Sequence, residues 1–210
     1  RGYSKKTALD FRLGYSPNTG DALVRYLKGK GISETEIKKA GLGSARMRGF
    51  GDMFRGRLMV PLSDQQGRVI GFTARLLEDD PNAPKYINTP QTIIYDKSRN
   101  VFGLHMAKDA IRKAGYSVLV EGNLDVIASH QAGVTNVVAT AGTALTEMQL
   151  KALQRLAGEV RLAFDQDRAG LSATERAIPI ASKVGIGINM ITVPSGKDPD
   201  ELIKTDPKLW

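Results

Sequence analysis

The chain has no cysteine among its 210 residues and only one tryptophan. The lack of cysteine excludes disulfide bonds and thiolate metal sites, so we expect no zinc ion in this fragment. No apolar run approaches the roughly 20 residues that a transmembrane helix needs. We therefore expect a cytoplasmic protein with no membrane partner. The first residue is Arg1 rather than methionine, which indicates a piece of a longer protein.

Positive charge is concentrated in the first half of the chain. Residues 1–115 contain 21 Lys and Arg against 11 Asp and Glu, whereas residues 116–210 contain 9 against 11. The first half thus carries a net charge of +10 and the second half −2, within a total of +8. A basic half of this kind is typical of a surface that binds a polyanion such as nucleic acid. An ordinary basic surface is the alternative.

Strand and helix patterns alternate along residues 116–210. Buried strands are predicted at YSVLVEG, VTNVVATAG, VRLAF and INMITVP, and helices at NLDVIASHQAG, TEMQLKALQRLAG and LSATERAIPIASK. Asn123 is the predicted N-cap of the first of these helices, and Thr146 with Gln149 forms a capping box at the second. This order predicts an α/β fold with a parallel sheet flanked by helices.

The first half predicts a smaller mixed α+β region. Residues 20–43 contain two short helical patterns, the second capped by Ser33 and Glu36. The segment RGRLMVPLSDQQGRVIGFTARLL predicts a β-hairpin, and EDDPNAPKYINTPQT, with three prolines, predicts a loop. We place a domain boundary near residue 115, so that residues 1–115 form a basic α+β subdomain and residues 116–210 a parallel-sheet domain.

Carboxylates follow three of the predicted strands at their carboxyl ends, where ligands bind in open α/β sheets. They are Glu121, Asp165, Asp167, Asp198 and Asp200. Carboxylate and water oxygens are the ligands that Mg²⁺ prefers, and two ions about 3.5 to 4 Å apart can assist phosphoryl transfer. Glu121 is also placed to act as a general base. The alternative for residues 165–170 is a solvated turn, since Asp and Gly are common in turns.

Several motifs, taken in order, resemble those of bacterial DnaG-type primases. EGNLDVIASHQAG, ATAGTALT, FDQDRAG and PSGKDPDEL resemble the TOPRIM domain, whereas FRLGYSP, MFRGRLMVPLSDQQGRVIGFTAR and PKYINTPQT resemble the basic subdomain that precedes it in primases. The resemblance covers nearly the whole chain. It implies a TOPRIM-type parallel sheet flanked by helices and preceded by a smaller mixed α+β basic subdomain. Gln166 and Asn123 depart from the family pattern, which usually has a glycine and an aromatic residue there.

The resemblance implies the catalytic core of a DNA primase, a nucleotidyltransferase that joins ribonucleoside triphosphates into a short RNA primer on a single-stranded DNA template. It implies that Glu121, Asp165 and Asp167 are catalytic and that these three, with Asp198 and Asp200, bind Mg²⁺ or Mn²⁺. It also implies that template and nucleotide phosphates are guided by Arg55, Arg57, Arg68, Arg75 and Lys85. The replicative helicase would be a partner through a domain absent from this chain.

Two other functions fit the same motifs. The first is another TOPRIM enzyme, either a nuclease or a topoisomerase. The second is a non-catalytic fragment that binds single-stranded nucleic acid, an interpretation that Gln166 keeps open. The role of Asp125 is also open, because its side chain can face the carboxylates or stabilise the start of its own helix.

Overall fold

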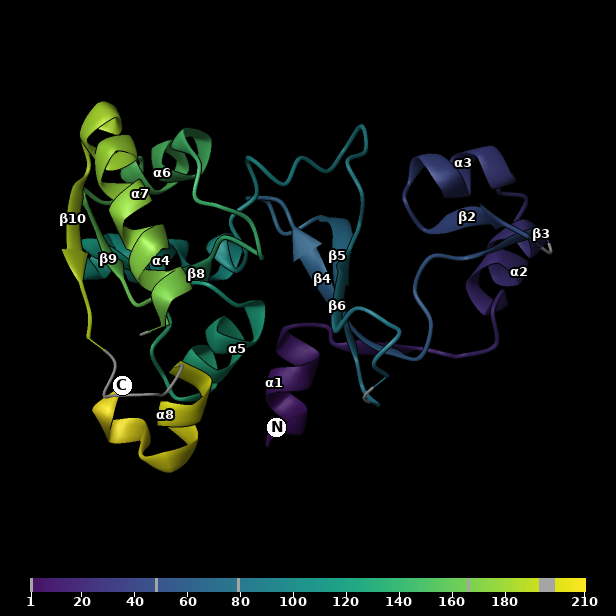
Figure 1. Ribbon diagram of the computed structural model, residues 1–210, viewed down its shortest axis with the longest axis horizontal. Coiled ribbons are helices and arrows are strands. Elements are labelled where there is room, and N and C mark those ends of the chain that lie inside the picture. Colours follow the sequence, from purple (N-terminus) through teal and green to yellow (C-terminus); the bar gives the residue numbers. More distant parts are fainter. Residues whose placement is uncertain (1, 48, 79, 166, 193–198) are drawn as a thin grey trace. The chain divides into compact units, whose positions relative to one another are not determined.

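The structure is a computed structural model that describes residues 2–47, 49–78, 80–165, 167–192 and 199–210. The chain divides into two compact units (Figure 1). Unit 1 comprises Arg1–Thr7, Ser63–Arg68 and Lys97–Trp210, and unit 2 comprises Ala8–Leu62 and Val69–Asp96. The boundary near residue 115 stays a prediction. None of the helices within the described ranges has the length and apolar character needed to cross a membrane.

Unit 1 is built on a parallel sheet of four strands in the order β10-β9-β7-β8. The strands are β7 (Tyr116–Val120), β8 (Val137–Ala139), β9 (Glu159–Leu162) and β10 (Gly187–Met190). The helices are α4 (Leu104–Ala114), α5 (Asn123–Gln131), α6 (Glu147–Gln154), α7 (Arg168–Val184), α8 (Pro199–Thr205) and the 3₁₀-helix η1 (Pro207–Leu209). The predicted α/β class with a parallel sheet and flanking helices is confirmed.

The core of unit 1 lies between this sheet and its helices. Leu119 on β7 and Leu150 on α6 are fully buried, and they share one apolar cluster with Ile111 on α4 and Ala177 on α7. Burial of such side chains is worth about 1.5 to 3 kcal/mol for each large aliphatic residue. The central strands are therefore anchored in this core.

Capping interactions set the starts of the helices. The Thr146 hydroxyl accepts a hydrogen bond from the Gln149 amide, and the Gln149 side chain accepts one from the Thr146 amide, which confirms the predicted capping box. The predicted N-cap at Asn123 is wrong. Gly122 occupies that position, because the Asp125 carboxylate accepts a hydrogen bond of 3.1 Å from the Gly122 amide and closes the turn one residue earlier. Asp125 thus stabilises the start of α5.

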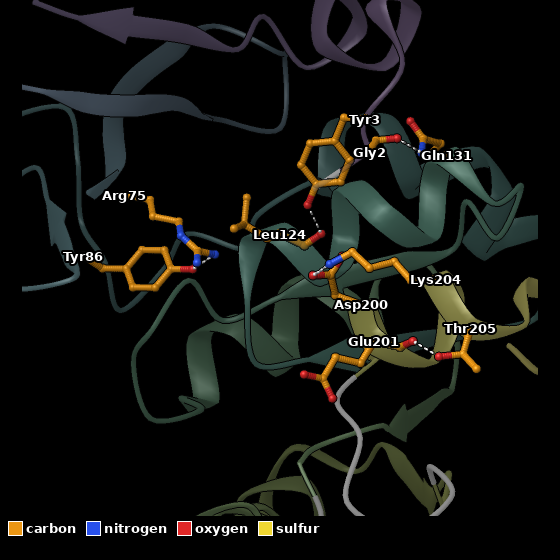
Figure 2. A network of polar contacts seen from close by, with 10 residues as sticks. All are labelled: Gly2, Tyr3, Arg75, Tyr86, Leu124, Gln131, Asp200, Glu201, Lys204 and Thr205. Carbon is orange, nitrogen blue, oxygen red and sulfur yellow. Dashed lines mark hydrogen bonds and ion pairs between the residues drawn. The ribbon is translucent and has the colours of Figure 1, made fainter. Parts of the chain in front are cut away.

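The N-terminal segment forms hydrogen bonds with residues at both ends of α5 (Figure 2). The Tyr3 hydroxyl donates a hydrogen bond of 3.0 Å to the Leu124 carbonyl, and the Gln131 side chain donates one of 3.1 Å to the Gly2 carbonyl. The Ser4 amide donates to the side-chain oxygen of the same Gln131. Both ends of α5, the helix that follows Glu121, are therefore held by residues from the start of the chain.

Unit 2 contains a four-stranded sheet in the order β1-β4-β5-β6 and a separate antiparallel ribbon, β2-β3. The strands are β1 (Gly14–Ser16), β2 (Gly43–Arg46), β3 (Gly49–Asp52), β4 (Arg57–Ser63), β5 (Val69–Leu76) and β6 (Tyr86–Asn88). The helices are α2 (Ala22–Gly29) and α3 (Glu34–Lys39), and α1 (Lys5–Asp10) precedes β1 in the chain. The β4–β5 hairpin and the Ser33–Glu36 capping box are as expected. The prediction of an unbroken loop in the proline-rich segment is wrong, because β6 pairs there with β5.

Candidate active site

The structure brings Glu121 and Asp165 together at the carboxyl edge of the parallel sheet. Glu121 follows β7 and Asp165 lies shortly after β9, and these strands pair in parallel with Leu119 opposite Leu162. The Asp165 amide donates a hydrogen bond of 3.3 Å to the Oε1 atom of Glu121. Two residues 44 positions apart in the sequence are thus in direct contact at the edge where the sequence analysis expects ligands.

The carboxyl group of Glu121 lies in a place that disfavours its charge. Burial raises the pKa of Glu121 above its ordinary value, and the negative charges of Asp165 and Asp167 raise it further. The hydrogen bond from the Asp165 amide opposes these effects. Burial and like charges act in the same direction, so a cation bound beside these carboxylates would relieve the repulsion.

Asp167 is the N-cap of α7. Its Oδ1 atom accepts a hydrogen bond of 2.8 Å from the Gly170 amide. The start of the helix approaches Asp165 so closely that a Cβ atom on Gly170 would overlap the carbonyl oxygen of Asp165 and lie 2.9 Å from its carbonyl carbon. Gly170 therefore permits the close approach of the start of α7 to the backbone of Asp165.

The later acidic motif is placed differently. Asp198 lies outside the described residues, and Asp200 lies in α8, where its side chain is 1% exposed and forms an ion pair of 2.7 Å with Lys204 (Figure 2). The charges that raise the pKa of Glu121 are those of Asp165 and Asp167, and Asp200 is not among them. Asp200 as a metal ligand stays a prediction.

The carboxylates suit a divalent cation. Within the described ranges, no group of three histidine, aspartate or glutamate side chains is arranged so that protein ligands alone could hold a metal ion. Mg²⁺ usually binds through one or two carboxylates together with water and substrate phosphates, so it does not need such a group of protein ligands. The oxygen donors and negative charges of Glu121 and Asp165 fit a divalent ion.

A cavity of about 520 Å³ lies beside Glu121 and was not predicted from the sequence. The loop after β8 borders it, and in this loop Ala141 has a φ of 59°, a left-handed conformation that is uncommon for a residue other than glycine. Phe164 and Arg176 also line the cavity. The signal available in the sequence is the run of small residues in ATAGTA directly after a strand.

The basic residues of unit 2 have different environments. Arg55 is exposed, whereas Arg57 is only 5% exposed, and both border a cavity of about 700 Å³. The Arg57 guanidinium donates hydrogen bonds to the carbonyl oxygens of Pro84 at 2.8 Å and Lys85 at 3.2 Å. Arg57 therefore fixes the backbone of the segment that carries the exposed side chain of Lys85.

Two further residues that were predicted to guide phosphates, Arg68 and Arg75, lie beside and in β5. The Arg75 guanidinium lies over the Tyr86 ring, 5.6 Å from its centroid, and donates a hydrogen bond of 3.2 Å to the Tyr86 hydroxyl (Figure 2). Arg68 forms an ion pair of 2.7 Å with Asp64 in the β4–β5 turn, and its side chain is 77% exposed. Both side chains have local partners, and neither is buried.

Replacement of Arg57 with leucine is expected to lower the free energy of unfolding by about 1 to 3 kcal/mol, because it leaves partly buried carbonyl oxygens without their charged donor. Replacement of the neighbouring Arg55 with leucine is the matched control and should change it by no more than about 0.5 kcal/mol. Urea denaturation of the two variants measures the difference. Equal stabilities would mean that Arg57 has no structural role.

The comparisons with known proteins agree with one another. A family model described as "DNA primase catalytic core, N-terminal domain" matches residues 1–108, and a "Toprim-like" model matches residues 118–203. A curated DNA primase of Clostridium acetobutylicum is 42% identical over 209 residues, which are 99% of this chain and 34% of that protein. The chain thus spans about a third of the length of this curated relative.

Solved structures resemble the whole chain. The RNA polymerase domain of Mycobacterium tuberculosis primase DnaG aligns with a TM-score of 0.91 and 36% identity, over 99% of this chain and 70% of that one. A DnaG primase catalytic domain bound to single-stranded DNA aligns with a TM-score of 0.90 and 32% identity, over 99% of this chain and 66% of that one. At this identity and coverage, the likeness extends beyond the fold to the family.

Proposed function

This chain belongs to the DnaG family of DNA primase catalytic cores, and on that premise we propose that it joins ribonucleoside triphosphates into a short RNA primer on a single-stranded DNA template. The observation that carries the proposal is the contact of Glu121 with Asp165 at the sheet edge, where the charge of Asp167 also acts. The single-stranded DNA bound by a solved relative supports this choice of template.

We propose that Glu121, Asp165 and Asp167 hold Mg²⁺ or Mn²⁺, with Asp198 and Asp200 as further ligands from the later motif. The bound ion would stabilise negative charge that develops on the phosphate oxygens. Glu121 would in addition accept the proton of the attacking 3′-hydroxyl, and its raised pKa brings it closer to the range in which a general base works at neutral pH.

We further propose that residues 1–115 guide the phosphates of template and nucleotide, and that residues 116–210 carry the chemistry. Arg55, Arg68, Arg75 and Lys85 would contact phosphates directly. Arg57 would act by holding the segment that presents Lys85. The replicative helicase would bind through a part of the protein outside this chain.

Three assays on the 210-residue chain test the proposal, each with Mg²⁺ or Mn²⁺ and each repeated with a chelator. We expect labelled ribonucleotides to be joined only when template and divalent ion are both present. Cleavage of DNA in the absence of nucleotides would instead identify a nuclease-type TOPRIM enzyme. Template binding that is unaffected by the chelator, without any primer synthesis, would identify a non-catalytic binding fragment.

A further inference from the structure

Unit 1 contains another cavity besides the one at Glu121. None of the described residues that line it is an aspartate or a glutamate. It has a volume of about 280 Å³ and lies between α4, the end of α6 and the turn of residues 63–68. Its polar lining consists of Lys108, Arg112, Arg155, Gln65 and Gln66. Three cations and two amides thus form the polar part of a lining that also contains the apolar Leu104, Ala152 and Leu156.

The three cations come from two helices. Lys108 and Arg112 lie one turn apart on α4, and Arg155 is the C-cap of α6. Arg112 forms an ion pair of 3.1 Å with Asp109, and its side chain remains 56% exposed. In the part of the chain that the structure describes, neither Lys108 nor Arg155 forms an ion pair. Like charges that share a small volume repel one another unless an anion lies between them.

The turn that supplies the two amides is held firmly by Asp64. Its Oδ1 atom accepts hydrogen bonds from the Gln66 amide at 2.9 Å and the Arg68 amide at 3.0 Å, and its Oδ2 atom pairs with the Arg68 guanidinium. The backbone of Gln65 and Gln66 is therefore ordered, while their side chains border the cavity. An amide NH₂ group donates hydrogen bonds that phosphate oxygens can accept.

The size of the cavity limits what can enter it. Pockets for drug-sized ligands have volumes of about 300 to 1,000 Å³, so this space is at the small end of ligand-binding cavities. A phosphate or diphosphate group fits within that limit. The Arg112 side chain is exposed, so the remainder of a longer ligand bound there can extend into solvent.

We propose that this cavity is a phosphate-binding site, distinct from the carboxylate site and formed by Lys108, Arg112 and Arg155 with the amides of Gln65 and Gln66. The phosphate belongs either to the backbone of a polynucleotide or to free diphosphate. The inference goes beyond the proposed function, because none of these five residues takes part in the chemistry assigned to the carboxylates.

The test compares two double variants of the 210-residue chain with the same change in net charge. Lys108→Gln with Arg155→Gln removes two cations from the cavity. Lys113→Gln with Lys208→Gln is the matched control, since both lysines are exposed in unit 1 and neither borders the cavity. Equal urea midpoints establish that both variants fold like the parent.

Binding is measured with a labelled single-stranded oligonucleotide, a labelled duplex and inorganic pyrophosphate, each at several salt concentrations. For the cavity variant we expect about five- to tenfold weaker binding of at least one of these probes, and no such loss for the control. If a single strand is the ligand, the slope of log K against log salt should fall by about 0.7 for one lost phosphate contact. A loss with pyrophosphate alone assigns the site to free diphosphate.

Equal losses in both double variants would overturn the proposal, because they would reflect net charge rather than the cavity. Unchanged binding of all three probes by the cavity variant would overturn it as well. Primer synthesis by the parent chain is measured in a separate assay. Failure of the proposed function and failure of this site are therefore distinguishable.

Discussion

Replacement of Glu121 with glutamine is expected to raise the stability of the metal-free chain at neutral pH while it lowers the rate of primer synthesis by about 10²- to 10⁴-fold. The stability gain follows because burial and the charges of Asp165 and Asp167 disfavour the ionised form of Glu121. Glutamine keeps the shape and an acceptor for the Asp165 amide but removes the charge. The rate falls because an amide neither accepts the proton nor binds a divalent ion well.

The stability gain should depend on pH with a definite sign. The pKa of Glu121 is raised in the folded chain above its ordinary value of 4.5, so between these two values the folded state binds more protons than the unfolded state. The parent chain therefore loses stability as the pH rises through that window, whereas the glutamine variant does not. As the pH falls further below 4.5, Glu121 becomes protonated in both states, and the stabilities of parent and variant should converge.

Urea denaturation in the presence of EDTA, at pH 7.5 and at about pH 4, measures this effect, and a template-dependent synthesis assay measures the rate. Glu175→Gln is the matched control, because Glu175 is an exposed residue of α7. It should leave both quantities unchanged. A Glu121→Gln variant that is less stable at pH 7.5, or that synthesises primers at the parent rate, would contradict the prediction.

The parallel sheet and the position of Glu121 with Asp165 were predictable from sequence because both follow from local patterns. Apolar strands, the capping box at Thr146 and the order of elements determine a parallel sheet, and the topology then brings the ends of β7 and β9 to one edge. The environment of Asp200 depends instead on how α8 packs after the sheet is complete. The i,i+4 spacing of Asp200 and Lys204 permits their ion pair on a helix, but no pattern in the sequence indicates that the Asp200 side chain is buried.

The features that escaped prediction depend on tertiary contacts. Strand β6 forms in a proline-rich segment because β5 offers it a partner, and such pairing overrides weak local propensity. Arg55 and Arg57 are two residues apart and identical in type, but it is Arg57 that is buried and donates hydrogen bonds to the carbonyl oxygens of Pro84 and Lys85. The sequence alone does not distinguish the structural arginine from the exposed one.

Replacement of Gly170 with alanine is expected to destabilise the chain by about 1 to 3 kcal/mol and to reduce primer synthesis. In an ordinary helix the same change stabilises by about 1 kcal/mol, so the expected sign is reversed. The reason is that the new Cβ atom would overlap the backbone of Asp165, which cannot move aside like a flexible side chain. The backbone of Asp165 or the start of α7 must then shift, and with it the contact of Asp165 with Glu121.

Gly29→Ala is the matched control for this effect. Gly29 is the last residue of α2, and a Cβ atom added there would have no heavy atom within 4 Å. We expect Gly29→Ala to be neutral or slightly stabilising in urea denaturation and to leave synthesis unchanged. If both glycine variants were equally stable, the close approach of α7 to Asp165 would not constrain the chain, and the placement of the two aspartates would need another explanation. A loss confined to Gly170→Ala attributes that placement to the absence of a single Cβ atom.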